Sequence, residues 1–182
     1  MTSPPHPATQ PAPAAGSASG LLRQVSAEDL PLFFEHQSDK EAVCMAAFTV
    51  KNPDDHEAFR VHWRRLLEDP DIMVLAIAQE DGKTVGHVMS YAMEGSLEVT
   101  YWLGREYWGR GLATRALSEF LRQHQPARPI YARAAADNTA SIRVLTKCGF
   151  VLSGRNRDYA NARGAEIEEC VFCLGGAPAE AV

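Results

Sequence analysis

Residues 98–114 read Glu-Val-Thr-Tyr-Trp-Leu-Gly-Arg-Glu-Tyr-Trp-Gly-Arg-Gly-Leu-Ala-Thr. Gly109 and Gly111 let the backbone turn sharply and approach a ligand with no Cβ in the way. Residues 110–124 follow with apolar side chains at helical spacing. A helix that starts behind such a turn offers unpaired N–H groups and the positive end of its dipole. The stretch therefore predicts a phosphate-binding site.

A Gly-x-Gly turn before a helix fits three kinds of phosphate-binding loop. A Walker A loop requires Gly-Lys-Ser/Thr, which is absent from this turn. A dinucleotide-binding loop requires a third Gly or Ala where Thr114 stands, and an acid ending the next strand, whereas Ile130–Ala135 contains none. The chain matches the remaining pattern, Gln/Arg-x-x-Gly-x-Gly/Ala, as Trp108-x-x-Gly111-x-Ala113. That pattern is typical of the pyrophosphate loop of an acetyltransferase.

The segments around the turn predict a mixed sheet. Apolar, β-capable residues predict strands at Met73–Gln79, Thr84–Met93 and Leu97–Leu103, and the short turns between them predict an antiparallel meander. The third strand continues through the helix into a further strand at Ile130–Ala135. A β–α–β crossover of this kind places its two strands parallel. The predicted fold class is therefore α/β, with an antiparallel first half and a parallel crossover.

The remaining elements complete one domain over residues 21–174. Before the meander, we expect a strand at Leu21–Val25, a helix at Ala27–Gln37 and a helix that starts at Asn52-Pro53-Asp54-Asp55 and ends near Glu68. After the crossover, we expect a helix at Asn138–Cys148 and two strands, Phe150–Arg157 and Glu166–Leu174, joined by a polar loop. Residues 1–20, rich in Pro and Ala, and residues 175–182 have too little apolar surface to offset the entropy of ordering. Both are predicted to be disordered tails.

Two motifs, in order, carry a resemblance to a known family. Residues 98–114 resemble the acetyl-CoA motif of the Gcn5-related N-acetyltransferase (GNAT) superfamily, in its RimJ/RimL-type branch. Asn138, Ser141 and Gly149-Phe150 match the second signature of that branch, Asn-x-x-Ser-x-x-x-x-x-x-x-Gly-Phe. The resemblance covers about residues 21–174. It implies a fold in which two parallel strands splay apart and the pantetheine arm of CoA inserts between them.

The resemblance also implies which residues bind acetyl-CoA as a cosubstrate. The backbone of Trp102, Leu103 and Gly104 would pair with the pantetheine. The side chain of Asn138 would hydrogen-bond the pantetheine near its sulfur. Arg143 would reach a CoA phosphate, with a solvated helix face as an equal alternative. The pyrophosphate would bind the N–H groups of Trp108, Gly109, Arg110, Gly111, Leu112, Ala113 and Thr114.

Transfer of the acetyl group to a primary amine by direct attack requires a neutral amine and a protonated leaving thiol. Ser141 lies one helical turn after Asn138 and would protonate the thiolate. Leu145 stands where many relatives have a Tyr for that step, which shifts the role to Ser141. Glu98, at the family's acidic position on the splayed strand, would act as the base directly or through water. A structural salt bridge or an orienting carboxylate is the alternative for Glu98.

The acceptor amine stays open between a protein N-terminal α-amine and a small cationic amine. His87, Met89 and Tyr91 share one face of a strand, where they would either line an acceptor pocket or pack in the core. The acidic first half of the chain agrees with a cationic acceptor. A non-catalytic acyl-CoA-binding or regulatory module is the competing hypothesis.

Composition excludes other functions. A net charge of -5 and a pI near 5.7 argue against binding to nucleic acid or an anionic membrane. The N-terminus lacks the basic start of a secretory signal, so we expect a cytoplasmic protein. No His accompanies Cys170 and Cys173 at zinc-site spacing, so we expect no metal. The sequence leaves the oligomeric state open, and a dimer is one of the states that it allows.

Overall fold

The computed structural model describes residues 21–176. The predicted N-terminal tail, residues 1–20, lies outside this range. The predicted C-terminal tail, residues 175–182, lies outside it from residue 177 onward. Within the described range, no helix has both the length and the apolar content needed to cross a membrane.

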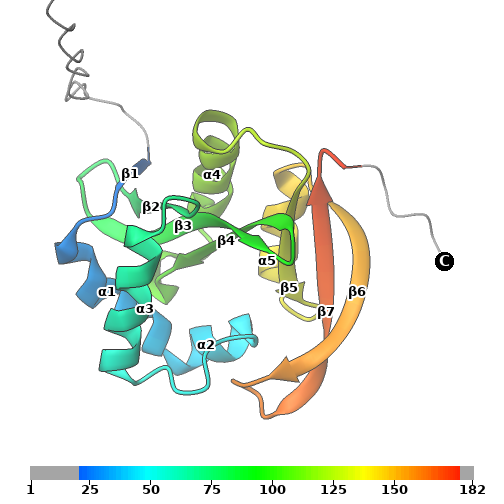
Figure 1. Ribbon diagram of the computed structural model, residues 1–182, viewed down its shortest axis with the longest axis horizontal. Helices are drawn as coiled ribbons and strands as arrows, with labels where there is room; N and C mark the ends of the chain where they lie inside the picture. The colour runs from blue at the N-terminus through cyan, green and yellow to red at the C-terminus, as the bar shows by residue number, and fades with distance from the viewer. Residues whose placement is uncertain (1–20, 177–182) are drawn as a thin grey trace, which may run out of the picture.

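A seven-stranded sheet forms the centre of the described chain, in the order β1-β2-β3-β4-β5-β7-β6 (Figure 1). Among its neighbouring pairs, only β4 and β5 run parallel. The prediction of a mixed sheet with a parallel crossover is therefore confirmed. The strands are β1 (Leu22–Gln24), β2 (Met73–Ala78), β3 (Thr84–Met93), β4 (Ser96–Leu103), β5 (Ile130–Ala135), β6 (Val151–Ala160) and β7 (Ala165–Leu174).

Helices cover both faces of this sheet. Contacts with the strands place α1 against β3, α4 against β4 and α5 against β5. Figure 1 shows α1, α2 and α3 below the central strands in this view and α4 above them. The helical segments are η1 (Ala27–Asp29), α1 (Leu30–Ser38), α2 (Lys40–Ala46), α3 (His56–Glu68), η2 (Arg105–Tyr107), α4 (Leu112–Glu119), η3 (Phe120–His124) and α5 (Thr139–Lys147).

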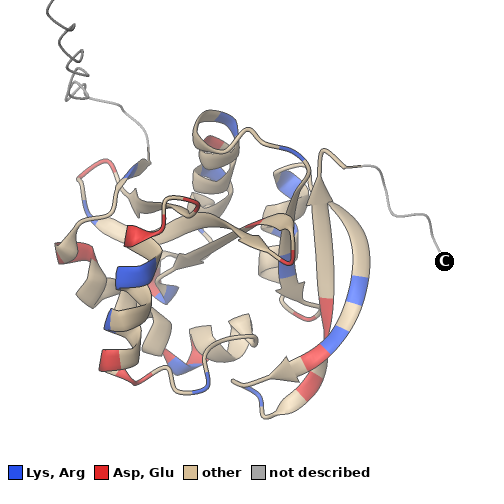
Figure 2. Cartoon of the chain, viewed as in Figure 1, with Lys and Arg blue, Asp and Glu red and all other residues tan. Residues whose placement is uncertain are grey.

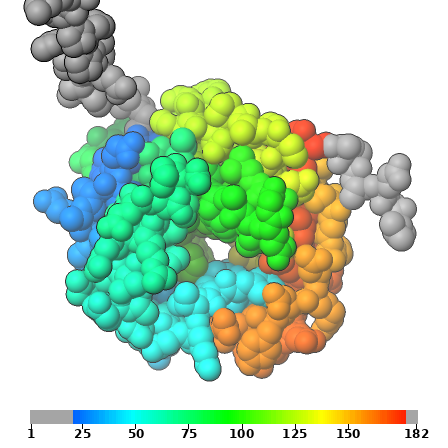
Figure 3. All heavy atoms as spheres, viewed as in Figure 1, coloured from blue at the N-terminus to red at the C-terminus, as the bar shows by residue number. Residues whose placement is uncertain are grey.

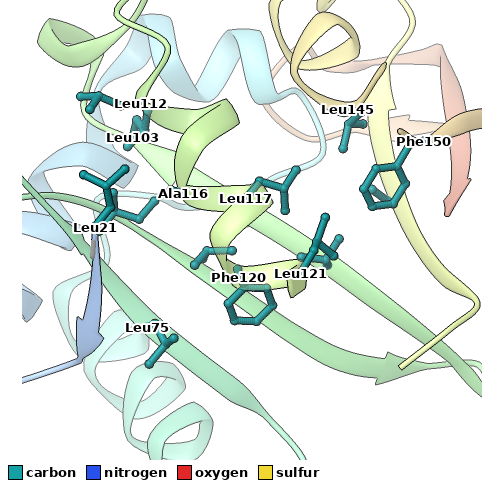
Figure 4. Packing of buried hydrophobic residues seen from close by; sticks show 14 of the residues in the cluster. Leu21, Leu75, Leu103, Leu112, Ala116, Leu117, Phe120, Leu121, Leu145 and Phe150 are labelled. Atoms are coloured by element: carbon teal, nitrogen blue, oxygen red, sulfur yellow. The ribbon is translucent and has the colours of Figure 1, made fainter. Parts of the chain in front are cut away.

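Strand alternation separates the two largest clusters of the core. Successive side chains of a strand point to opposite faces of the sheet. Val88 of β3 therefore joins the larger cluster, with Leu117 and Phe120 from α4 and η3. Figure 4 shows this cluster continuing beneath α5 through Leu145 and Phe150. The neighbouring residue on β3 joins a second cluster beneath α1 and α3, which contains Phe33, Trp63 and Met89.

The predicted splay of the central strands is present in the register of the sheet. A single residue pair, Glu98 opposite Tyr131, joins β4 to β5. Beyond that pair β5 bonds β7 along its whole length, from Ile130 to Ala135. The later residues of β4 consequently have a strand neighbour only on the β3 side. The sheet thus opens between β4 and β5 immediately after their contact.

Three element boundaries differ from the sequence-based prediction. Helix α2 was not predicted; Asp39 caps it by accepting from the N–H groups of Glu41 and Ala42. The long helix α3 begins at His56 rather than at Asn52, because the Asp55 carboxylate caps it. The polar loop predicted between the last two strands is also shorter, because β6 and β7 remain paired as far as Ala160–Ala165.

The β6–β7 hairpin keeps pairing because its backbone bonds outweigh the polarity of its side chains. β6 is an edge strand, and nearly all of its side chains are exposed or half-buried. Figure 2 shows basic and acidic residues alternating along this hairpin. Charges on an edge strand oppose pairing with another chain. A polar composition therefore does not exclude a strand at the edge of a sheet.

The start of α3 can be tested by removing its cap. Asp55→Ala deletes the carboxylate that accepts from the Ala58 N–H at 2.9 Å. The expected result is a loss of about 1 kcal/mol in the free energy of unfolding, measured by urea denaturation. Asn52→Ala, at the residue where the sequence predicted the helix start, should change it by less than about 0.5 kcal/mol. A larger loss for Asn52→Ala than for Asp55→Ala would contradict the observed start.

Candidate active site

The glycine turn forms a cradle of free N–H groups at the start of α4. Gly109 and Gly111 both have a φ of 74°, a left-handed conformation that favours glycine. Gly111 is the N-cap of α4 and offers no side chain to cap it. Within the described residues, no backbone or side-chain acceptor takes the N–H groups of residues 109–114. The cradle therefore has the donors and the dipole that an anionic phosphate requires.

Two cations stand beside this cradle. The Arg110 guanidinium lies 5.7 Å from the centre of the Tyr107 ring, and the Lys83 ammonium lies 5.5 Å from it. Tyr107 itself is buried. The face of an aromatic ring attracts cations, so Tyr107 holds both charges near the turn. Lys83 was not singled out from the sequence, because it comes from the β2–β3 turn, far from the glycine motif in the chain.

The residues predicted to pair with pantetheine already bind parts of the chain. The Gly104 N–H donates to the Val85 carbonyl at 3.0 Å. The Trp108 indole donates to the Leu103 carbonyl at 3.1 Å, so the residue that replaces the usual Gln or Arg ties the turn to the end of β4. The Trp102 indole donates to the His36 carbonyl at 3.1 Å and fixes the end of α1. The pairing of residues 102–104 with pantetheine stays a prediction.

The second motif shapes the start of α5. The Asn138 side chain is the N-cap, with its Oδ1 atom accepting from the Ser141 N–H at 3.0 Å. Its Nδ2 atom donates to the Met45 carbonyl of α2 at 3.2 Å. Arg143 bonds the carbonyl and the hydroxyl of Thr139 in its own helix. Both side chains predicted to contact CoA thus have partners within the chain, and their contacts with CoA stay predictions.

Ser141 is joined across the splay to a residue that the sequence analysis did not single out. The Tyr101 hydroxyl lies 2.9 Å from the Ser141 hydroxyl. Burial raises the pKa of Tyr101 to about 12, so its hydroxyl stays protonated at neutral pH. Tyr101 lies within the motif, but only strand alternation together with the position of α5 brings the two hydroxyls together. They form a hydroxyl pair that spans the opening from β4 to α5.

Glu98 lies in a buried ionic cluster at the root of the splay. Its side chain is only about 3% exposed, and its Oε1 atom accepts from Arg133 Nε at 2.9 Å. Arg133 also lies 3.3 Å from the Glu169 carboxylate on β7. Burial raises the pKa of Glu169, while Arg133 opposes the shift. This geometry favours the salt-bridge interpretation of Glu98 that the sequence left open, and its role as a base stays a prediction.

A pocket of about 480 Å³ lies on the other face of β4, beneath α3. His87, Met89 and Tyr91 all line this pocket, and Met89 also packs in the second core cluster, so this strand face combines the two interpretations that the sequence left open. Burial lowers the pKa of His87 to about 3. Thr100, Tyr101 and Trp102 of β4 also contribute to the wall. The same stretch of β4 thus borders this pocket on one face and the hydroxyl pair on the other.

Comparison with known proteins identifies the family. A family model described as an acetyltransferase (GNAT) domain matches residues 21–151. The chain belongs to this GNAT family, of the RimJ/RimL type. The resemblance inferred from the two motifs is therefore confirmed.

Individual relatives agree with this assignment. The GNAT chain is 33% identical over 94 residues to an N-acetyltransferase p20 of Bacillus licheniformis that is described as uncharacterized. That match covers 50% of the chain and 53% of the relative, so the chain spans about half the length of the curated relative it matches.

Solved structures show the same fold at lower identity. A ribosomal-protein-alanine N-acetyltransferase from Brucella melitensis has a TM-score of 0.70 and 22% identity, over 85% of this chain and 98% of that chain. RimJ from Mycobacterium smegmatis, in complex with CoA-disulfide, has a TM-score of 0.68 and 21% identity, over 84% of this chain and 80% of that chain. These two likenesses concern the fold.

The cradle can be tested through its left-handed glycines. Gly111→Ala forces a side chain into a conformation that costs roughly 1–2 kcal/mol, and the backbone should shift to relieve it. We expect acetyl-CoA affinity, measured by calorimetry, to fall by about tenfold. Gly95→Ala is a matched control, because Gly95 also has a positive φ and free space around its Cβ, but lies in the β3–β4 turn. Equal affinities in the two variants would argue against a cofactor site at residues 109–114.

Proposed function

We propose that the chain transfers the acetyl group of acetyl-CoA directly to a primary amine, with no covalent enzyme intermediate. One observation carries the proposal: beyond Glu98, β4 separates from β5 and has functional groups against both of its faces. The hydroxyl pair of Tyr101 and Ser141 lies on the α5 side. The pocket beneath α3 lies on the other side. Two reactants could therefore meet across a single strand.

The residues present fit acetyl-CoA. The free N–H groups of residues 109–114 would hold its pyrophosphate, with Arg110 and Lys83 adding positive charge. The opening between β4 and β5 would receive the pantetheine arm as a substitute for the missing strand. Acetyl-CoA supplies a thioester whose acyl carbon is open to attack by a neutral amine. Pairing with Trp102–Gly104 would require the pantetheine to compete with the Trp108 indole for the Leu103 carbonyl.

Ser141 would protonate the departing thiolate. Tyr101 is protonated and its hydroxyl lies in hydrogen-bond range of the Ser141 hydroxyl, so the tyrosine can donate to the serine oxygen. Ser141 would then keep its own proton for another acceptor. On α5, Leu145 occupies the position where many relatives have a Tyr that protonates the thiolate. Tyr101 on β4 would instead assist Ser141 in this proton transfer. Tyr101 is in this account a positioning residue and Ser141 a catalytic one.

The demand for a base depends on the acceptor. An α-amino group with a pKa near ~8 is about 10% neutral at pH 7, whereas an amine with a pKa near ~10.4 is under about 0.1% neutral. Glu98, if it acts as the base, would do so through water, because Arg133 already occupies one of its oxygens. Glu98 would otherwise orient the acceptor through the charge of its cluster.

The fold alone does not choose the acceptor. Solved structures of the same fold are named for acceptors as different as the alanine of a ribosomal protein and spermidine. A protein N-terminal α-amine and a small cationic amine both remain candidates within the proposal. We further propose a cytoplasmic location.

The proposal is tested by release of free CoA thiol from acetyl-CoA in the presence of an amine panel. Peptide N-termini, linear amines and aminoglycosides represent the acceptor classes. At least one class should give sustained thiol release well above the rate without amine. Binding of acetyl-CoA with no release across the whole panel would favour the alternative of a non-catalytic acyl-CoA-binding module.

The hydroxyl pair gives a second test. Ser141→Ala should lower kcat by about a hundredfold or more, the scale of general acid catalysis, and leave acetyl-CoA affinity within about twofold. Tyr101→Phe should lower kcat by about five- to tenfold, as expected for one hydrogen bond worth about 1 kcal/mol. Ser153→Ala is the control, because its hydroxyl bonds the Val171 carbonyl on β7, away from the splay. Unchanged turnover in Ser141→Ala would exclude the proposed role.

A further inference from the structure

The pocket beneath α3 is elongated along β3. It touches this strand from His87 to Ala92, a span of about 16 Å at roughly 3.3 Å per residue. Figure 3 shows α3 and the β3–β4 hairpin at the border of a hollow in the centre of the molecule. Its two ends have different chemistry, and each end comes from different elements.

One end of the pocket is acidic. Asp69 and Asp71 line it from the loop between α3 and β2. Figure 2 shows acidic residues gathered where α3 ends and the chain turns toward β2. Among the described residues, neither carboxylate forms an ion pair; the Asp69 carboxylate accepts only from the Asp71 N–H. The pocket lining contains no Lys or Arg to balance these two charges.

The middle of the pocket is apolar. Leu66 from α3, Ile72 from the loop and Met89 from β3 line it. Such a wall offers nothing to the peptide N–H and C=O groups of an extended chain, which would lose their water without gaining a partner. It suits a run of methylene groups.

The other end holds an unpartnered histidine. His87 is 3% exposed, lines the pocket and packs against the rings of Phe33 and Trp63, each with its centre 4.9 Å away. Its Nδ1 atom has no hydrogen-bond partner among the described residues. Because the ring stays neutral, it can accept a hydrogen bond from an amine. His87 lies opposite Trp102, so this end adjoins the part of β4 that has left β5.

From these two ends we propose that the pocket binds a linear diamine, with the amine to be acetylated near Thr100–Trp102 and the second ammonium between Asp69 and Asp71. Thr100 and Trp102 are opposite Met89 and His87, three and five residues from Ala92, so the two amines would be about 10 to 16 Å apart. The inference rests on the proposed function and names the substrate class of the same site. The reacting nitrogen forms the C–N bond as the C–S bond breaks; it gives up one proton to a base or water, and the thiolate receives one.

A matched pair of amines tests this assignment. The full chain is assayed with 1,8-diaminooctane and with octylamine, by thiol release from acetyl-CoA, and diamine binding is measured separately by calorimetry. We expect kcat/KM for the diamine to exceed that for the monoamine by at least about tenfold, the effect of one charge-assisted contact worth about 1.4 kcal/mol. In the double variant Asp69→Asn/Asp71→Asn, diamine KM should rise by about tenfold or more while monoamine kcat/KM stays within about twofold.

A control and the contrary outcomes separate this inference from the proposed function. Glu28→Gln/Asp54→Asn removes two exposed acids that do not line the pocket, and should leave both amines unaffected. Equal use of the two amines by the wild-type chain, or a peptide N-terminus used in preference to the diamine, would overturn the inference while the acetyltransferase activity stands. Absence of thiol release with every amine contradicts the proposed function instead. Calorimetry then decides the pocket alone: diamine binding that is no weaker in the double variant would overturn it.

Discussion

β4 and β5 share one register pair, Glu98 opposite Tyr131. The parts of the site on β4 and α5 depend on the separation of the two strands beyond this pair. A parallel pair that stops after one contact leaves the later β4 backbone without a neighbour on that side, and unpaired backbone groups require a substitute partner. The separation also makes room for the hydroxyls of Tyr101 and Ser141 to meet between β4 and α5. Chemistry is thus concentrated where a β ladder is interrupted.

A buried ionic cluster lies where β4 and β5 separate. Arg133 on β5 binds Glu98 on β4 and Glu169 on β7, so one guanidinium connects three strands where the sheet opens. Removing one partner of such a cluster leaves an uncompensated buried charge, which is strongly destabilising. Two carboxylates against one guanidinium also leave a net negative charge near the acceptor side. The charge that holds the strands in position therefore also favours a cationic reactant.

Several parts of this site could be predicted from the sequence because they depend on local conformation. The Gly109–Gly111 turn is an example, since both glycines adopt the left-handed conformation that the pattern requires, and the next residues start a helix. The role of Asn138 was less predictable. Binding of the cofactor by its amide stays a prediction, while the structure shows that the amide caps α5 and bonds Met45 of α2, a helix absent from the prediction. Short helices such as α2 carry a weak periodic signal, and their position is decided by packing.

By itself, the sequence determined the order of strands and helices, the parallel crossover and the conformation of the glycine turn. These follow from hydrophobic periodicity, turn residues and glycine conformation, all of which act over a few neighbouring residues. Only the tertiary structure decided that Tyr101 meets Ser141, that Arg133 neutralises Glu98, and that acids after α3 share a pocket with His87. Those contacts join residues far apart in the chain, and their geometry is fixed by how the strands separate and which helix covers each face.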